Sequence, residues 1–173
     1  SKVTTVGDNV FVNSKVTKVD LSGATNLKSC YNLFLDCAEL TEVVLSNNAT
    51  TISHSMFENC VKLDKINIPT KLTYLNTDLF MNSGITSIEI PANIKKIGAT
   101  SATGKIWAMT KGNVFSGCKN LTTVTVKGTD VELAGYNFVD CEKLTTVGET
   151  AGKLDTSVFS VIGTLAFEGA GLT

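Results

Sequence analysis

Four cysteines recur at one position of a repeated segment, and they are the residues whose spacing could do chemistry. Cys37, Cys60, Cys118 and Cys141 each lie three residues after a phenylalanine. Thiols in one column could form disulfides, bind a metal or stay reduced in the core. Neighbouring members could lie ~4.8 Å apart, within the reach of a disulfide. Their Cβ vectors should be parallel, which suits a bridge poorly, so we predict reduced, buried thiols.

Other arrangements for metal binding or catalysis are weak. These four cysteines lie at least 23 residues apart along the chain, whereas zinc sites use closely spaced pairs. His54 is the only histidine, so any histidine-based metal cluster or catalytic triad would require it; we expect a solvated side chain. Acid pairs such as Asp140 and Glu142 fall in expected turns. We therefore predict no catalytic residue, no metal site and no cofactor, and we leave the role of Cys30 open.

The cysteines belong to a repeat that organises the whole chain. The segment from Phe57 to Pro69 has the pattern Phe-x-x-Cys-x-x-Leu-x-x-Ile-x-Ile-Pro. Other copies begin at Phe11, Phe34, Phe80, Phe115 and Phe138, and a seventh begins at Phe167. Most copies start 23 residues apart, while the intervals 80 to 115 and 138 to 167 are 35 and 29 residues long. A fixed period with added lengths predicts stacked coils with loop insertions. The copies at Phe11 and Phe80 are one residue shorter and carry Ser in place of Cys.

The second half of each copy alternates as a short strand does. The expected strands are residues 16–21, 40–45, 63–68, 85–90, 121–126 and 144–147. Successive strands one coil apart run in the same sense, so they should form a parallel sheet with right-handed connections. Threonines that follow the first apolar position should form a ladder on this sheet. They are Thr17, Thr41, Thr86, Thr122, Thr145 and Thr173.

Each coil also needs a corner and a return segment. An apolar residue precedes most repeat phenylalanines, and Val6-Gly7, Ile97-Gly98 and Ile162-Gly163 predict tight corners with positive φ at glycine. Residues 22–29 contain no clear apolar step. The few residues before each phenylalanine fit a single α or 3₁₀ turn. The expected fold is an α/β solenoid: a right-handed superhelix of about seven coils, each of ~23 residues with one short parallel strand and one helical or 3₁₀ turn.

Length and composition limit the function classes. The 173 residues fit a single domain, 1–173, with loop insertions at about 99–112 and 148–157. The net charge is -1 and all the basic residues are lysine, so the bidentate fork that grips phosphates and guanine edges is absent and nucleic-acid binding is not expected. Apolar runs are too short to span a bilayer, so we expect no membrane insertion. Ser1 is not an initiator Met, which fits a mature or excised chain without its signal peptide.

The first insertion departs most from the repeat. It holds the only Trp of the chain, Trp107, in a setting of Gly, Ser and Thr. A projecting loop would make Trp107 an aromatic anchor for a partner. Alternatively, Trp107 folds back over the flank of the solenoid, and of the two this is our expectation.

Alternate strand residues should point outward and form a surface for a partner. We call this set the front face: Lys18, Asp20, Glu42, Val44, Lys65, Asn67, Ser87, Glu89, Thr123 and Thr125. Its mixture of charges and hydroxyls gives no field of one sign. The front face is therefore either a site for protein or glycan contact, together with Trp107, or an ordinary solvated sheet surface.

The pattern Ile-Gly-x-x-Ala-Phe, at 162–167, and the strand pattern at 57–69 resemble the BspA-like class of leucine-rich repeats. The resemblance covers nearly the whole chain. It implies a bacterial cell-surface or secreted protein without enzymatic activity that attaches to a host or matrix protein or glycan. An alternative is a structural spacer of a longer surface protein, with head-to-tail self-association through an open C-terminal coil.

Overall fold

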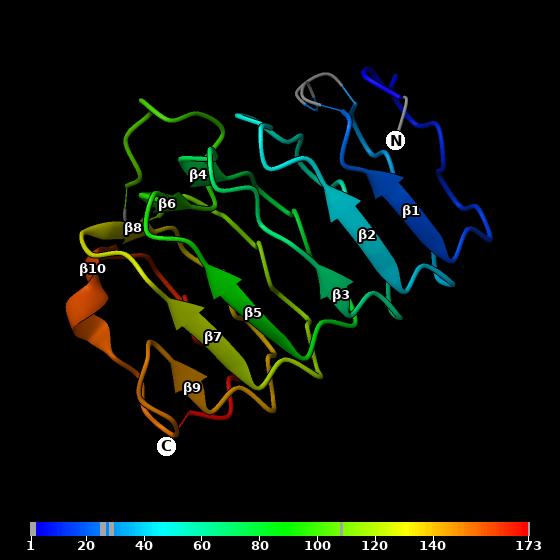
Figure 1. Cartoon of the computed structure of the whole chain (residues 1–173). Helices are drawn as coiled ribbons and strands as arrows, with labels where there is room; N and C mark the ends of the chain where they lie inside the picture. The colour runs from blue at the N-terminus through cyan, green and yellow to red at the C-terminus, as the bar shows by residue number, and fades with distance from the viewer. Residues whose placement is uncertain (1–2, 25–26, 28–29, 108, 173) are drawn as a thin grey trace.

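The computed structural model describes residues 3–24, 27, 30–107 and 109–172. The chain forms a stack of coils whose first strands run side by side along one face (Figure 1). These strands are β1 (Lys18–Leu21), β2 (Glu42–Leu45), β3 (Lys65–Ile66), β5 (Ser87–Ile90), β7 (Thr123–Val126) and β9 (Thr146–Val147). Every pairing among them is parallel, in the orders β1-β2-β3 and β5-β7-β9. The prediction of like-directed strands is confirmed, and the number of coils and their handedness stay predictions.

The threonine ladder is also confirmed where the structure describes it. The Thr41 hydroxyl donates to the carbonyl of Thr17 at 2.9 Å, and the Thr122 hydroxyl donates to the carbonyl of Thr86 at 3.0 Å. Asp64 replaces threonine in the third coil, and its carboxylate accepts hydrogen bonds from the amide and the hydroxyl of Thr86. Thr173 lies outside the described residues. The ladder thus adds side-chain bonds between coils to those of the backbone.

A second parallel sheet lies where we expected only corners. It contains β4 (Tyr74–Leu75), β6 (Lys96–Ile97), β8 (Val131–Leu133) and β10 (Phe159–Ile162) in the order β10-β8-β6-β4. The prediction of one strand per coil is therefore wrong. Gly98 has the expected positive φ, 82°. The prediction is wrong for Gly7 and Gly163, which do not have positive φ. Gly163 is required for another reason, because a Cβ there would lie 2.2 Å from the backbone nitrogen of Gly135.

The expected helical turns are turns of another kind. We call the five residues centred on each repeat phenylalanine the turn wall. In every copy φ is positive two residues before and two residues after the phenylalanine, as at Asn32 (52°) and Asp36 (61°). This backbone directs N–H groups to the next coil: Phe34 N–H donates to the carbonyl of Met56 at 3.0 Å, and Asp36 N–H to that of Glu58 at 3.1 Å. A helix would bond within its own coil, and η1 (Thr156–Val158) is the only helix among the described residues.

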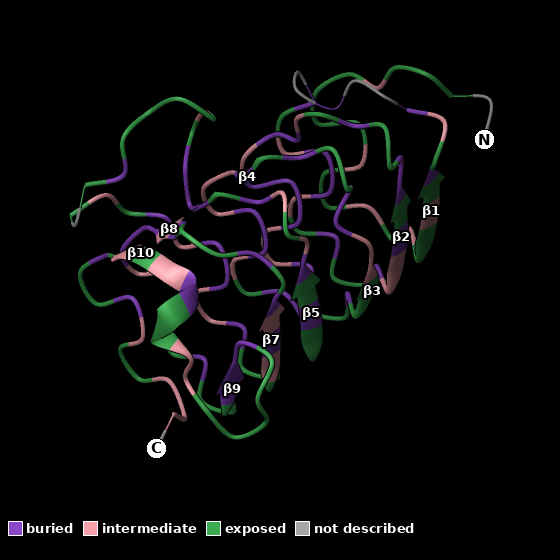
Figure 2. Ribbon diagram, turned by 60° about the vertical axis from the view of Figure 1, so that its left-hand side comes forward, coloured by how far each residue is buried: buried purple, intermediate pink, exposed green. Residues whose placement is uncertain are grey.

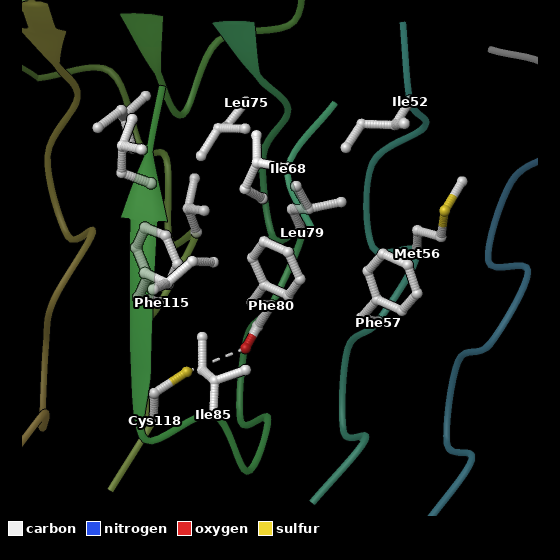
Figure 3. Packing of buried hydrophobic residues seen from close by; sticks show 14 of the residues in the cluster. Ile52, Met56, Phe57, Ile68, Leu75, Leu79, Phe80, Ile85, Phe115 and Cys118 are labelled. Atoms are coloured by element: carbon white, nitrogen blue, oxygen red, sulfur yellow. Dashed lines mark hydrogen bonds between the residues drawn. The ribbon is translucent and has the colours of Figure 1, made fainter. Parts of the chain in front are cut away.

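The repeat phenylalanines form one continuous column in the core. Phe34, Phe57, Phe80, Phe115 and Phe138 are fully buried, and Phe11 and Phe167 are partly buried at the two ends. Successive rings are stacked, with centroids between 5.2 Å (Phe115 to Phe138) and 5.7 Å (Phe80 to Phe115) apart. Figure 3 shows part of this column with aliphatic side chains around it. Aromatic pairs at this separation contribute beyond the area they bury.

Two copies, those at Phe80 and Phe167, have a glycine four residues after the phenylalanine, at a point where a Cβ would not fit. In the copy at Phe80 the chain passes close to the preceding coil, and a Cβ on Gly84 would lie 2.3 Å from the carbonyl oxygen of Val61. The copy at Phe167 repeats this contact, since a Cβ on Gly171 would lie 2.3 Å from the carbonyl oxygen of Glu142. Gly84 N–H donates to Cys60 and Gly171 N–H donates to Cys141, both at backbone carbonyls. At Gly84 and Gly171 the backbone of one coil therefore lies directly against the backbone of the preceding coil.

The first coil departs from the repeat less than its sequence indicates. Leu27 is fully buried and forms a parallel bridge with Ile52. It therefore supplies the apolar step that we could not identify in residues 22–29. Leu27 lies seven residues before its repeat phenylalanine, whereas Ile52 lies five before its own, and this shift hid it from the pattern.

Candidate functional site

Six residues of the front face are exposed, and the other four, Glu42, Asn67, Thr123 and Thr125, are half-buried. Side chains alternate outward and inward along β2 and β5, and Val44 is 41% exposed at the middle of β2 (Figure 2). Pairing aligns Lys18 with Glu42 and Glu42 with Lys65. Lys18 Nζ lies 3.0 Å from a Glu42 carboxylate oxygen, and this hydrogen bond lowers the pKa of Glu42. The N-terminal half of the face is thus a row of alternating charges beside an exposed valine.

Across β5 and β7 the front face is dominated by hydroxyl groups. Ser87 is aligned with Thr123, and Glu89 is aligned with Thr125. Ser87 and Glu89 are exposed, whereas Thr123 and Thr125 are half-buried. This half offers hydrogen-bonding groups around one carboxylate.

The face is interrupted after β3. Strand β3 contains only two residues, and the Asn67 side chain continues the pairing in place of backbone. Its Oδ1 accepts from Leu45 N–H at 2.7 Å, and its Nδ2 donates to the Leu45 carbonyl at 2.9 Å. A shallow hollow of about 250 Å³ lies here, lined by Glu42, Val43, Val44, Lys65, Ile66 and Asn67. Asn67 therefore shapes the front face and also bonds two coils together.

Trp107 does not fold back, so our expectation for this side chain is wrong. The indole is 67% exposed and Met109 is 82% exposed, while Ile106 is buried in a cluster with Tyr74, Ala99 and Ala134. The Glu132 carboxylate holds the loop through Ile106 N–H and Lys96 Nζ, each at 3.3 Å. Lys96 Nζ also donates to the Gly104 carbonyl. A partly buried ion pair thus fixes the base of the loop and leaves its aromatic tip in solvent.

The structure does not bring Trp107 together with the strand residues of the front face. Its loop follows β6 of the second sheet and returns at Lys111, which forms an isolated parallel bridge with Gly135, two residues after β8. In Figures 1 and 2 the loop projects from the β4–β6–β8 region, away from β1, β2 and β3. The predicted site residues therefore belong to two separate surfaces.

A second surface feature, which the sequence did not indicate, lies near this loop. We call it the aromatic hollow: about 300 Å³, lined by Tyr31, Ile52, His54, Tyr74, Asn76 and Thr100. The rings of Tyr31 and His54 lie 5.1 Å apart and are tilted by 38°. Tyr31 is 45% exposed, whereas Tyr74 is buried, and that burial raises the pKa of its phenol. His54 is half-buried against Tyr31 and not simply solvated as we predicted.

The four cysteines of the column are buried and reduced, as predicted. Each thiol donates to the carbonyl of the repeat phenylalanine in the preceding coil, and not to that of its own coil. Cys60 donates to Phe34 at 3.0 Å, and Cys118 donates to Phe80 at 3.1 Å (Figure 3). Cys30 is buried too, and its thiol donates to the Leu27 carbonyl at 2.9 Å. Within the described ranges, no three His, Cys, Asp or Glu side chains converge as metal ligands would. The cysteines therefore join coils and fill the core.

These thiols should be unreactive in the folded protein. Burial raises the pKa of Cys60 to about 12 and that of Cys118 to about 11, from an ordinary 9.0. Because the thiolate is the nucleophile, we expect 5,5′-dithiobis(2-nitrobenzoic acid) at pH 8 to label the native protein at least tenfold more slowly than a cysteine peptide. Labelling in guanidinium chloride is the control, and labelling of the native protein at the peptide rate would contradict the assignment.

The same shifts set the direction of the alkaline pH dependence. The folded state holds these protons more tightly than the unfolded chain, so their contribution to stability is complete below pH ~9 and is lost as the pH rises through 11 to 12. Urea titrations at pH 8 and pH 10 should show the lower midpoint at pH 10.

These features define a class: a solenoid repeat protein built from stacked, parallel-stranded coils. A model of the "BspA type Leucine rich repeat region" matches residues 1–104 and 109–172 in six copies. The chain belongs to this BspA-type leucine-rich repeat family. No curated protein matches it. In the described part of the chain, no helix is long and apolar enough to cross a bilayer.

Solved structures support the fold. A leucine-rich repeat protein from Bacteroides ovatus aligns over 99% of this chain and 46% of its own, with a TM-score of 0.66 and 16% identity. One from Eubacterium ventriosum aligns over 92% of this chain and 44% of its own (TM-score 0.59, 20% identity). The leucine-rich repeat protein of T. pallidum aligns over 80% and 70%, with a TM-score of 0.58 and 23% identity. This chain thus spans less than half the length of two of these three proteins.

Proposed function

We propose that this chain is a non-enzymatic binding module of a bacterial cell-surface or secreted protein and that it attaches to a host or matrix protein through its front face. The family membership supports a repeat module that presents a surface to partners. The main observation is Val44, an exposed apolar side chain on a rigid strand, beside the hollow at Asn67 and between charged neighbours. An apolar centre with a polar rim is the usual anatomy of a protein interface.

The rigidity of the strands that carry the front face also supports this binding role. The outward side chains stand on strands whose inward side chains, such as Val43 and Leu45, are buried in one continuous core. A partner would therefore meet a surface already in its binding conformation, which reduces the entropy cost of association. The proposed contact is with the polypeptide of the partner and not with its glycans, and it uses the front face alone.

Val44→Glu should test this assignment. The charge would occupy the centre of the proposed interface, and we expect affinity for an immobilised matrix protein to fall at least tenfold, as for loss of a central contact. Val44 is exposed, so stability should change by no more than about 0.5 kcal/mol. Binding is measured by surface plasmon resonance on enzymatically deglycosylated collagen, fibronectin and laminin.

Lys119→Ala provides a control in the turn that precedes β7, at an exposed residue whose ion pair with Glu142 spans 3.3 Å. It should leave binding unchanged. If Val44→Glu binds as well as the unaltered protein, or if none of the three matrix proteins binds, the proposed interface is wrong.

A further inference from the structure

The aromatic hollow combines ring faces with polar groups in one small concavity. Three rings line it, those of Tyr31, His54 and Tyr74, together with the amide of Asn76 and the hydroxyl of Thr100. Its volume of about 300 Å³ is at the lower end of the range for small-molecule sites. The hollow is assembled from four successive coils, and hydrogen bonds between coils hold Tyr31, Tyr74 and Asn76.

Hydrogen bonds from Asn76 and from the Tyr31 backbone fix the lining of the hollow. Asn76 Oδ1 accepts from Thr77 N–H at 2.9 Å, and Asn76 Nδ2 donates to the Ile52 carbonyl at 3.3 Å. An amide has two N–H donors and two acceptor lone pairs, so Asn76 keeps one of each beyond these two bonds. The Tyr31 backbone is fixed in turn by the Asp8 carboxylate, which accepts from Tyr31 N–H at 2.9 Å. The site is thus preformed, and its polar groups retain bonding capacity.

The chemistry of the lining selects an uncharged ligand with an apolar face and a hydroxyl rim. No lysine, aspartate or glutamate is among the described residues that line the hollow. Aromatic rings have negative faces that attract C–H groups, while the amide, hydroxyl and imidazole groups both donate and accept hydrogen bonds. A pyranose ring has this combination, because its axial C–H groups lie on one face and its hydroxyls at the edge.

A second, smaller hollow extends the site across the stack. It measures about 100 Å³ and shares Thr100 with the first. Its lining includes the hydroxyl residues Thr77, Ser101 and Thr110 and also the two lysines Lys105 and Lys111. Lys111 lies over the ring of Tyr136, 5.2 Å from the centroid, and Lys105 lies over Trp107 at 5.6 Å. Both ammonium groups are thus engaged by aromatic faces beside the hollow.

We propose that the aromatic hollow and its extension past Thr100 form a binding site for a neutral oligosaccharide, with one sugar ring against Tyr31, His54 and Tyr74 and the next beside Thr77 and Thr100. This site lies apart from the front face and does not depend on it. It gives the module a second, glycan-directed surface whose residues come from the turns and the second sheet.

The test is a binding screen followed by variants. The unaltered chain is applied to a printed panel of neutral oligosaccharides of glucose, galactose, mannose and N-acetylhexosamines, with sialylated and sulfated glycans alongside. The proposal expects binding confined to neutral glycans. For the best neutral glycan, Tyr31→Ala and Thr100→Tyr should each reduce affinity at least tenfold in isothermal titration calorimetry, the first by removing a ring face and the second by filling the hollow.

Val44→Glu is the matched control and should bind the glycan as the unaltered chain does. Tyr31 and Thr100 are exposed, so both variants should fold, and unchanged circular dichroism and urea midpoints verify this. The proposal is overturned if no neutral glycan binds, if only charged glycans bind, or if the Tyr31 and Thr100 variants retain full affinity. Glycan loss in these variants with retained binding to deglycosylated matrix proteins separates this site from the front face.

Discussion

Phe80→Ala is expected to lower the free energy of unfolding by about 3–5 kcal/mol, the range for emptying a fully packed phenylalanine site. Phe80 is fully buried and its ring is stacked on two others, with centroids 5.4 Å from Phe57 and 5.7 Å from Phe115. The substitution therefore removes two ring contacts and leaves a cavity between two coils. Urea denaturation followed by far-UV circular dichroism measures the loss.

Two variants of the same column serve as controls. Phe11 is only partly buried and stacks on a single ring, that of Phe34, so Phe11→Ala should cost about 2 kcal/mol. Phe80→Leu keeps most of the buried volume and should cost about 1.5 kcal/mol. Equal losses from Phe80→Ala and Phe11→Ala would show that the stacked column is not the main support of the core.

The position of Phe80 predicts a second effect. Each coil of a solenoid contacts only its neighbours, so a weak interface can separate the stack into two cooperative units. Hydrogen exchange of Phe80→Ala should then give different opening free energies for amides before and after this coil. In the unaltered chain the same amides should share one value in the central coils.

Gly84→Ala is expected to lower the free energy of unfolding by about 3 kcal/mol, although it adds a single methyl group. The added Cβ would lie 2.3 Å from the carbonyl oxygen of Val61 and 2.8 Å from its carbonyl carbon. Neither atom belongs to a flexible side chain, so the two coils must move apart, and the bond from Gly84 N–H to Cys60 would weaken. The shift in the urea midpoint reports the cost.

The repeat offers a natural control for this substitution. Lys15 holds the equivalent position in the other short copy with Ser for Cys, at Phe11, and its side chain is exposed. Lys15→Ala should therefore change stability by less than about 0.5 kcal/mol. A Gly84→Ala protein as stable as the unaltered chain would mean that the close approach at Val61 imposes no constraint on this copy.

The core and the first set of strands follow from the repeat because one rule acts on every coil. A phenylalanine, a cysteine and three aliphatic residues recur at fixed spacing, and burial of all of them against neighbours leaves little choice of arrangement. The Phe34 and Phe57 rings, the thiol of Cys60 and the direction of β1 and β2 were predictable for this reason.

The second sheet was less accessible to prediction because its strands are very short. Tyr74–Leu75 and Lys96–Ile97 contain two residues each, too few for an alternating pattern to show. The turn wall was misread for a different reason. Asn, Asp or Gly stands two residues after each repeat phenylalanine, and these residues tolerate positive φ best. The backbone follows this preference for positive φ and does not form the helical turn that we expected.

The aromatic hollow depends on contacts between coils that residue types alone do not reveal. Tyr31 and His54 each lie three residues before a repeat phenylalanine, and this shared position could have paired them. Tyr74 and Thr100 come from the second sheet and the loop after it, and nothing in their spacing connects them with Tyr31. The outward positions of the front face followed from strand alternation alone, while their division from Trp107 did not, and a binding role for these residues stays a prediction.

The coil-to-coil bonds of the turn wall also determine how the molecule should respond to mechanical force. The first and last described segments lie at opposite ends of the stack (Figure 1), so tension transmitted along the chain pulls parallel to the stacking axis. Coils should then peel away one at a time, each 23-residue unit releasing about 70–80 Å of extended chain. Such a stack would lengthen stepwise under load and act as an extensible tether between whatever it joins.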